Sequence, residues 1–545
     1  MWPARRRFKT HRFIMTGLMI TISLLLSLSA CKRDNRDFNV IFISMDTTRA
    51  DYIDTGRGAR AYTPEIKKFS KKSLVFERAY AAIPLTLPSH LSLFSSHMPH
   101  ELGVLNNDYP YEGDIRMIQE VLQERDYYTA GIISLGTLAG STGFNRGFQD
   151  FYEDLFAEKI FFVPAEKVVD RALQVVDAAA NNPGRNFFLF LHFSDPHSPY
   201  APPAVHTNFK ISVDGKPEAD FNAYHGAILR SKVNLDKGRH TIDFKLEGPM
   251  DDFTFFIIRR LKFDKNCAIS LDNLTFSQEH YGGSYLMAKP QAAVRVACSG
   301  GNRMEIFQVI PILTPQAAVR YYREEVEYMD RQIGRFLRHI EQSGLLEKTL
   351  LVMFADHGEG LGERHGFYGH TRYLNQQFIH VPLIMHLPGE KIGRIQAPVS
   401  LTAVSPTILE FLDIRDKGFR RELSLMKLIE TGKRKYGDYP VYSFTFAPDS
   451  IDDKLSVIRW PYQGIFYFDG DKLSDREIYN LGMSQSYTYK DALFHEVVKK
   501  NSIIHYRTFL KEYARLKKAF NRSGTKKVLV DNRTLDKLNS LGYIR

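Results

Sequence analysis

The segment that most constrains this fold is a run of mainly apolar, β-branched residues at positions 38–45 that ends at Asp46. Such a run is typical of a parallel strand that is buried on both faces. Extended and helical segments alternate along most of the chain, which favours a parallel sheet covered by helices on both sides. We therefore predict a doubly wound α/β fold in which Asp46 lies at the carboxyl end of a strand.

The same periodicity places the other elements of this sheet. Helices are predicted at 64–72, 89–95, 116–125, 165–180, 316–341 and 402–412. Strands are predicted at 74–80, 127–134, 186–193, 349–355 and 380–386. These elements assign residues 38–204 and 314–430 to one α/β domain that is interrupted by an insertion.

The pattern changes between residues 205 and 313. Helical periodicity disappears, and the segment 240–246 alternates strictly between apolar and polar residues. We predict an inserted β-sandwich over 205–313. Cys267 and Cys298 lie within it, and the sequence is compatible with either a disulfide or two buried thiols.

The region 431–545 is predicted to be a C-terminal subdomain. Strands near 441–446, 454–460 and 464–468 indicate a small antiparallel sheet, and 504–520 reads as a basic amphipathic helix.

The N-terminus has the three parts of an export signal. Basic residues precede an apolar run that is short for a membrane span, and the segment 28–31 then resembles the bacterial lipobox. In this interpretation 1–30 is a signal peptide, Cys31 is lipidated and 31–37 is a tether. The protein would then be an exported lipoprotein, anchored in a membrane on the periplasmic or surface side of the bacterial envelope. An uncleaved anchor helix is the alternative.

The formal net charge of +11 does not indicate a nucleic-acid partner. Residues 1–30 hold five basic and no acidic side chains, so their removal lowers the charge to +6. The lysines near the C-terminus are expected to form a solvated face or to approach anionic lipid. With only three cysteines, the chain must hold any metal mainly through carboxylates, histidines or hydroxyls.

Four segments place polar residues at the ends of predicted strands, namely 43–51, 85–90, 192–200 and 354–360. The carboxyl ends of strands in a doubly wound sheet converge on one rim, so these segments can share a site. Two aspartates, a histidine and a hydroxyl make a mixed oxygen and nitrogen site for Ca²⁺, Mn²⁺, Mg²⁺ or Zn²⁺. A single such aspartate is often only a helix N-cap. Four segments together favour the shared site.

In these motifs the chain resembles the sulfatase family of the alkaline phosphatase superfamily. Segments 39–51, 85–94, 187–200, 356–363 and 381–384 match the family in order, and 538–544 resembles many family C-termini. The resemblance covers nearly everything outside the insertion and implies a sulfatase-like catalytic domain.

By position, the resemblance implies a set of metal ligands and a nucleophile whose oxygen is also coordinated: Asp46, Asp356 and His357, with Thr86 as the nucleophile. It also implies histidines that contact the substrate: His197 and His370, with His365 as an alternative to His370. We expect His90, which stands where the family has an arginine, to contact the substrate as well. One of these histidines, with His90 as a candidate, would protonate the leaving group.

The departures from the family shift the expected chemistry. Thr86 replaces the Cys or Ser that becomes formylglycine, and threonine cannot yield that aldehyde, so no formylglycine is expected. His90 replaces an arginine, and Thr47 a second acid. A sulfated threonine would have to be cleaved by water at sulfur, whereas phosphorus accepts an in-line attacking water more readily.

We therefore predict a metal-dependent hydrolase of phosphate, phosphonate or sulfate esters that forms a covalent Thr86 intermediate, with phosphoesters favoured. The substrate would be an anionic ester on a glycan or a lipid. One alternative is a transferase that moves a phospho-group onto envelope glycans or lipids. Another is a catalytically inactive surface lipoprotein that binds glycan.

Overall fold

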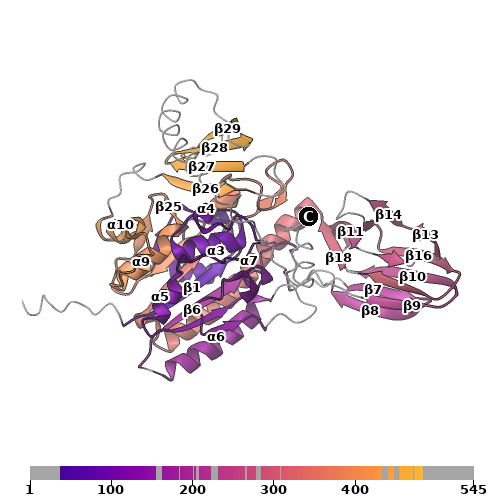
Figure 1. Ribbon diagram of the computed structural model, residues 1–545, viewed down its shortest axis with the longest axis horizontal. Helices are drawn as coiled ribbons and strands as arrows, with labels where there is room; N and C mark the ends of the chain where they lie inside the picture. The colour runs from indigo at the N-terminus through magenta and orange to yellow at the C-terminus, as the bar shows by residue number, and fades with distance from the viewer. Residues whose placement is uncertain are drawn as a thin grey trace, which may run out of the picture.

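An eight-stranded, mostly parallel sheet forms the centre of the protein (Figure 1). The computed structural model describes residues 37–482, except for 108, 155–162, 183, 201, 204–207, 223–230, 249, 260, 264–266, 278–283, 307, 433–439, 447–452 and 470–471. In spatial order the strands are β24 (Gly393–Ile395), β2 (Leu74–Phe76), β23 (Leu383–His386), β19 (Thr349–Phe354), β1 (Asn39–Met45), β6 (Phe187–Phe193), β4 (Tyr128–Ile132) and β5 (Asp150–Tyr152). Strand β23 runs antiparallel to both its neighbours, and the other pairings are parallel.

Strand β1 lies in the middle of this sheet, and each of its residues is buried. The Phe42 ring makes edge-to-face contacts with Phe94 and Phe188, with centroids 5.6 and 5.3 Å apart. The parallel register pairs Ser44 with Phe354 of β19 and with His192 of β6. The three central strands therefore end at the same level, as a site at the carboxyl edge requires.

Helices cover both faces of the sheet (Figure 1). One group consists of α2 (Pro64–Ser70), α6 (Ala165–Ala180) and α7 (Pro315–Gln342), and a second of α3 (Thr86–Ser95), α5 (Ile118–Gln123) and α9 (Val404–Phe411). Shorter helices are α4 (Pro99–Leu102), α8 (Gln376–Ile379) and α10 (Met426–Thr431). The predicted doubly wound α/β fold is thus confirmed.

Two predicted elements differ in detail because of proline. Helix α3 begins at Thr86 rather than Ser89, since Pro88 occupies the first turn, where a missing N–H costs nothing. The predicted strand 380–386 is divided at Pro382 into β22 (His380–Val381) and β23. Strand β22 pairs with β3 (Ala79–Tyr80), which also pairs with β25 (Val399–Ser400).

The insertion consists of antiparallel sheets that lie to one side of the central sheet (Figure 1). One sheet contains β7 (Asn208–Val213), β8 (Lys216–Asn222), β10 (Gly238–Glu247), β13 (Cys267–Asp272) and β16 (Gln291–Cys298). A second contains β11 (Phe253–Arg259), β14 (Leu274–Ser277), β15 (Ser284–Met287) and β18 (Gln308–Leu313), and a third β9 (Ser231–Leu235), β12 (Lys262–Phe263) and β17 (Asn302–Ile306).

The first two of these sheets share an apolar core. Phe209 of β7 contacts both Phe244 of β10 and Phe256 of β11. Cys267 and Cys298, whose state the sequence left open, form a disulfide between paired positions of β13 and β16. These contacts give the insertion the two-layered packing predicted for it.

A C-terminal antiparallel sheet contains β26 (Val441–Thr445), β27 (Asp453–Arg459), β28 (Tyr462–Asp469) and β29 (Lys472–Asn480), of which β29 was not predicted. It is attached to the α/β domain by hydrogen bonds from the Phe444 amide to the Ala82 carbonyl (2.8 Å) and from Gln376 to Gln463 (2.8 Å). The predicted signal peptide 1–30, Cys31 and the basic helix 504–520 lie outside the described residues. Within the described part of the chain, no helix has the length and apolar character needed to cross a bilayer.

Helix α2 depends on a carboxylate from another helix. Asp330 of α7 is fully buried and accepts hydrogen bonds from the amides of Glu65 (3.2 Å) and Ile66 (2.9 Å) in the first turn of α2. We expect Asp330→Ala to lower the free energy of unfolding by about 1–2 kcal/mol, because it leaves these amides without an acceptor. Urea denaturation measures the change. Asp170→Ala, which removes an exposed pair with Arg335, is the matched control and should cost below about 1 kcal/mol.

The pH dependence of this cap is also predictable. Burial raises the pKa of Asp330 from 3.8 to about 6. The folded state then holds the proton more tightly than the unfolded state, so the stability that Asp330 contributes falls as the pH rises through this window. Asp330→Asn should therefore gain stability relative to wild type between pH 4 and pH 7 in parallel denaturation curves. A constant difference would contradict the raised pKa.

Candidate active site

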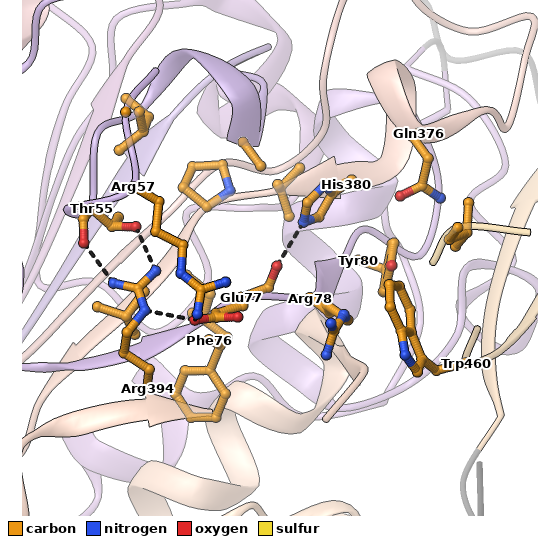
Figure 2. Close-up of a pocket in the computed structure, with 18 of the residues that line it drawn as sticks. Thr55, Arg57, Phe76, Glu77, Arg78, Tyr80, Gln376, His380, Arg394 and Trp460 are labelled. Atoms are coloured by element: carbon orange, nitrogen blue, oxygen red, sulfur yellow. Dashed lines mark hydrogen bonds and ion pairs between the residues drawn. The ribbon is translucent and has the colours of Figure 1, made fainter. Parts of the chain in front are cut away.

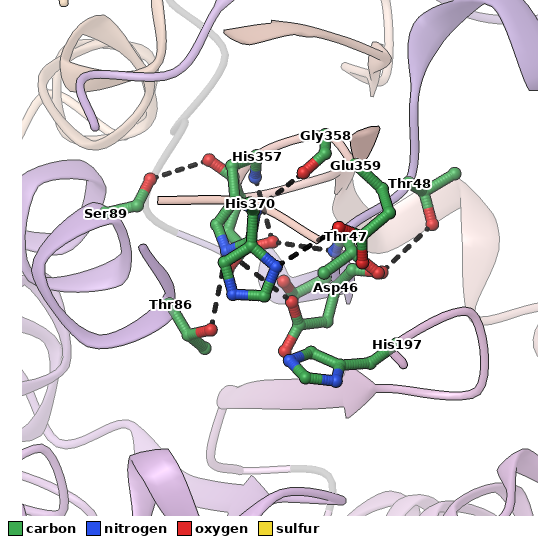
Figure 3. A network of polar contacts seen from close by, with 12 residues as sticks. Asp46, Thr47, Thr48, Thr86, Ser89, His197, His357, Gly358, Glu359 and His370 are labelled. Carbon is green, nitrogen blue, oxygen red and sulfur yellow. Dashed lines mark hydrogen bonds and ion pairs between the residues drawn. The ribbon is translucent and has the colours of Figure 1, made fainter. Parts of the chain in front are cut away.

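The candidate site lies where the central strands end. Asp46 directly follows β1, and Asp356 and His357 come shortly after β19. Figure 3 shows Asp46, Thr86 and His357 close together, with His370 beside them. Thr86 begins α3 on the neighbouring side. The sheet thus brings together residues separated by about 310 positions, as the carboxyl-edge rule predicts.

Asp46, Asp356 and His357 form a compact, fully buried cluster in which one ligand atom of each lies within 4.8 Å of the others. The His357 Nε2 atom is 3.4 Å from Asp356 Oδ2 and 3.8 Å from Asp46 Oδ1. Its Nδ1 lies 2.9 Å from the Gly358 carbonyl. Since Nδ1 must donate to that carbonyl, we assign the lone pair to Nε2, which faces the carboxylates.

The buried charges of this cluster fit a cation. Both carboxylate oxygens of Asp46 and Oδ2 of Asp356 make no hydrogen bond of normal geometry with the described residues, although ring nitrogens of His192 and His90 lie 3.2 and 3.6 Å away. Burial and then the charge of Glu359 raise the pKa of Asp46, and burial and then Asp46 raise the pKa of Asp356. Burial, followed by His370, lowers the pKa of His357. Two carboxylates and a neutral imidazole are the donor set that a divalent metal ion takes in proteins.

Thr86 points toward this cluster from the first turn of α3. Its Oγ1 lies 3.4 Å from His357 Nε2, and the side chain is fully buried. Ser89, one turn further on, donates a hydrogen bond of 2.7 Å to the Asp356 carbonyl. This bond joins the start of α3 directly to the loop that carries the candidate metal ligands.

His90 lies behind Thr86, buried within the same helix. Its Nδ1 is 2.7 Å from the Thr86 carbonyl, and its Nε2 is 2.8 Å from the Ser44 hydroxyl. Both ring nitrogens therefore have protein partners, and Nδ1 is also 3.6 Å from Asp356 Oδ2. This geometry suits a residue that positions Thr86 and Asp356. A contact between His90 and substrate stays a prediction.

His197 and His370 lie beside each other at the site. Their ring centroids are 5.1 Å apart, and those of His370 and His357 are 4.4 Å apart. Burial lowers the pKa of His370 to about 3, and burial followed by His370 lowers the pKa of His197. His365, the alternative to His370, is exposed and lies near Tyr373 instead.

Two buried side chains at the site were not among the predicted site residues. Glu359 is fully buried, and its Oε1 is 3.4 Å from His370 Nδ1. His192 is also fully buried, with Nε2 at 3.2 Å from Asp46 Oδ2 and Nδ1 at 3.0 Å from the Ser134 hydroxyl. Both residues occur in the segments singled out by sequence. The sequence signal that could have identified them is an ionisable residue within a buried strand for His192, and an ionisable residue three positions after Asp356 for Glu359.

Thr47 occupies an unusual backbone conformation. Its φ of 55° is in the left-handed region, which a β-branched residue rarely adopts. The conformation is held by bonds from its amide to Asp356 Oδ1 (3.3 Å) and from the Tyr322 hydroxyl to its carbonyl (2.8 Å). The backbone of Thr47 is thus part of the site even though its side chain is not acidic.

This fold and this buried cluster place the chain in the alkaline phosphatase superfamily. Within that superfamily it belongs to the sulfatase family, since the family model named Sulfatase matches residues 38–414. An N-acetylglucosamine-6-O-sulfatase from Bacteroides thetaiotaomicron is 24% identical over 506 residues, covering 85% of this chain and 87% of that protein. A choline-sulfatase from Rhizobium meliloti is 23% identical over 390 residues, covering 69% of this chain and 68% of that protein.

Solved structures share the fold. A protein in complex with its substrate D-glucosamine-2-N,6-O-disulfate has a TM-score of 0.59 and 15% identity, covering 88% of this chain and 98% of that one. A phosphonate monoester hydrolase from Silicibacter pomeroyi has a TM-score of 0.56 and 17% identity, covering 87% of this chain and 96% of that one. At these identities the similarity establishes the fold alone.

The candidate metal site is testable by ligand removal. We expect Asp46→Asn and Asp356→Asn each to weaken divalent-ion binding by roughly tenfold or more, because each loses a charged donor. Calorimetric titration with Mg²⁺, Ca²⁺, Mn²⁺ and Zn²⁺ in turn measures the change. Asp177→Asn on the exposed face of α6 is the control. Unchanged affinity in both site variants would refute the cluster as a metal site.

The position of the missing acid gives a second test. We expect Thr47→Asn to raise stability by about 1 kcal/mol, since asparagine tolerates a positive φ better than a β-branched residue. Thr47→Asp should raise stability by a similar amount for the same reason. It should also bind a divalent ion more tightly than Thr47→Asn does. Thermal denaturation with and without added metal separates the two effects. Equal metal affinities would mean that residue 47 does not face the ion.

Proposed function

We propose that this protein hydrolyses phosphate or phosphonate esters through a covalent intermediate on Thr86. The observation that carries the proposal is the placement of the Thr86 hydroxyl beside the Asp46, Asp356 and His357 cluster. A threonine cannot be converted to formylglycine, so a simple ester on its hydroxyl is the covalent species open to it. Sulfate esters remain within the proposed substrate range, with phosphoesters favoured.

The proposed reaction follows from the positions of the side chains. A divalent ion held by Asp46, Asp356 and His357 would supply a lowered hydroxyl pKa and positive charge opposite the ester oxygens. Thr86 Oγ1 gives its proton to Nε2 of His197 and forms a bond to phosphorus. The bond from phosphorus to the leaving-group oxygen breaks as that oxygen takes the proton from His197. Water then cleaves the phosphothreonine by attack at phosphorus, which restores the threonine.

The buried histidines are assigned to the ester itself. His370 donates a hydrogen bond to a non-bridging oxygen. The Nδ1 atom of His197 donates to the Ser198 carbonyl (2.6 Å), so Nε2 of the neutral ring carries a lone pair and donates to the ester only after it has taken up a proton. We assign protonation of the leaving group to His197 in place of His90, because both ring nitrogens of His90 have protein partners. A neutral imidazole is the form that burial favours, and negative charge developing on the ester would raise its proton affinity.

The substrate proposed is an anionic ester carried by a glycan. The support is that one relative is named as an N-acetylglucosamine-6-O-sulfatase and a structural neighbour holds a disulfated glucosamine. Phosphonate monoester hydrolases of the same fold support the phosphorus chemistry. The lipobox-like segment ending at Cys31 supports action at an envelope membrane, which radiolabelled fatty acid incorporation into wild type and Cys31→Ser would test.

Transfer to an acceptor is the second candidate function. A lipoteichoic acid synthase 2 from Bacillus subtilis is 31% identical over 111 residues, covering 19% of this chain and 17% of that protein. An acceptor alcohol would then replace water in the second step. Product analysis in the presence of glycerol separates the two outcomes, because a transferase yields a glycerol ester and a hydrolase yields the free anion.

The nucleophile is tested by paired substitutions. We expect Thr86→Ala to lower kcat by roughly a thousandfold or more, and Thr86→Ser to keep most of the activity, because serine retains the hydroxyl. The assay uses an aryl phosphate, an aryl phosphodiester, an aryl phosphonate and an aryl sulfate, each with and without chelator. Preserved glycan binding without turnover in wild type would support the inactive alternative. Faster turnover of sulfate than of every phosphorus ester would refute the preference for phosphorus.

A further inference from the structure

A cavity lined by three arginines lies where the C-terminal sheet meets the α/β domain (Figure 2). Its volume is about 510 Å³, which lies in the range of about 300–1,000 Å³ typical of small-molecule sites. One wall comes from β2, β3 and β22, and the other contains Trp460 from the turn after β27. The cavity is separate from the Asp46 cluster, none of whose members lines it.

The charge of the cavity is strongly positive. Arg57, Arg78 and Arg394 line it, and Glu77 is its one carboxylate among the described residues, which leaves a net charge of +2. Arg57 and Arg394 share a single oxygen of Glu77, at 2.8 and 2.6 Å. Figure 2 shows both guanidinium groups converging on Glu77 at one end of the cavity. Arg394 also donates one N–H from each Nη atom to Thr55, to its carbonyl (2.6 Å) and its hydroxyl (3.1 Å). The second N–H of each Nη atom and the Arg57 guanidinium, which pairs with Glu77, leave donors for another anion.

The opposite end of the cavity holds a guanidinium against an aromatic ring. The Arg78 Cζ atom lies 3.5 Å from the centroid of the Trp460 ring. Within the described residues, Arg78 has one hydrogen-bond acceptor, the Gln396 carbonyl, for its five N–H groups. Stacking on Trp460 fixes the plane of the guanidinium, which favours recognition of an anion with paired oxygens.

The cavity is connected to the candidate active site by the chain. Ala50 lines it four residues after Asp46, and Gln376 of α8 lines it six residues after His370. The nearby acid Asp51 is bound by Arg49 and Arg60 and does not neutralise the cavity. A ligand here would therefore contact the same loops that carry the reacting groups.

We propose that this cavity is a binding site for an anionic saccharide unit, one that carries a sulfate, phosphate or carboxylate group. Arg57 and Arg394 would bind the anionic group at one end of the cavity, and Arg78 would bind oxygens of the same unit at the other end. Gln376 Nε2 and Asn480 Oδ1 bond to Gln463 and Gly482, so the Gln376 Oε1 and Asn480 Nδ2 atoms would face sugar hydroxyls. A site of this kind selects glycans with charge at a second position, away from the ester that is cleaved. Only the link between this binding and turnover rests on the proposed function.

Trp460 reports directly on the cavity. The chain has two tryptophans, Trp2 and Trp460, so Trp2→Phe makes Trp460 the sole tryptophan of the full chain. Its fluorescence is titrated at constant ionic strength with glucose 6-sulfate, glucose 6-phosphate, glucuronate, glucose, sodium sulfate and sodium phosphate. We expect saturable changes with the charged sugars, none with glucose, and weaker binding of the inorganic anions.

Substitutions locate the response. Arg57→Ala and Arg394→Ala do not touch Trp460 and should weaken binding of the charged sugars by roughly tenfold or more. Arg421→Ala is the matched control, since Arg421 is as exposed as Arg57 (57% and 58%) and pairs with Glu410 outside the cavity. Turnover of a small aryl ester should be unchanged in all three variants.

The outcomes separate this proposal from the proposed function. No response of Trp460 to any charged sugar, equal binding of sugars and inorganic anions, or a response only to phosphatidylglycerol vesicles would each overturn the saccharide site. Aryl ester turnover could persist in all of these cases. Conversely, retained turnover in Thr86→Ala would overturn the nucleophile while the Trp460 response stands.

Discussion

The parallel pairing of β1 with β6 and β19 is the constraint on which the rest of the structure depends. Register in a sheet is set by which side chains are buried, and a slip of one residue would turn each side chain to the other face. Burial of β1 on both faces, with Phe42 packed between Phe94 and Phe188, makes such a slip costly. Because the register is fixed, β1 and β19 end at the same level, and Asp46 and Asp356 therefore lie at the same edge of the sheet.

Burial, more than net charge, determines which protonation states are favoured in the site that results. Burial raises the pKa of the Asp46, Asp356 and Glu359 carboxyls, and it lowers that of the neighbouring imidazoles. Buried acids and buried histidines both disfavour their charged forms, so the cluster is unstable as a set of unpaired ions. A cation bound among the carboxylates would offset the cost of burying their negative charge. The same environment would strengthen every interaction with an anionic ester, since little water competes.

Much of this arrangement is predictable from sequence, and the exceptions have physical causes. Strand ends could be located because an apolar run that stops at an acid is a local signal, as at Asp46. The division of 380–386 at Pro382 depends on which strand pairs with which, and that is a long-range property. Glu359 and His192 were not predicted as site residues because their importance comes from contacts across the fold. The roles of His90 are likewise visible only in its bonds to Ser44 and Thr86.

The two departures from the family pattern near Thr86 both lie next to Asp356. Where formylglycine sulfatases carry an acid and an arginine, this chain has Thr47 and His90, so one negative and one positive charge are absent together. Both positions meet Asp356, through the Thr47 amide at Oδ1 (3.3 Å) and the His90 ring near Oδ2 (3.6 Å). Burial lowers the pKa of His90 and so favours its neutral form. Thr47 and a neutral His90 therefore have the same summed charge, zero, as an acid and an arginine. Thr86, on the same rim, cannot form the family's aldehyde, so three positions close to Asp356 and His357 depart from the family pattern together.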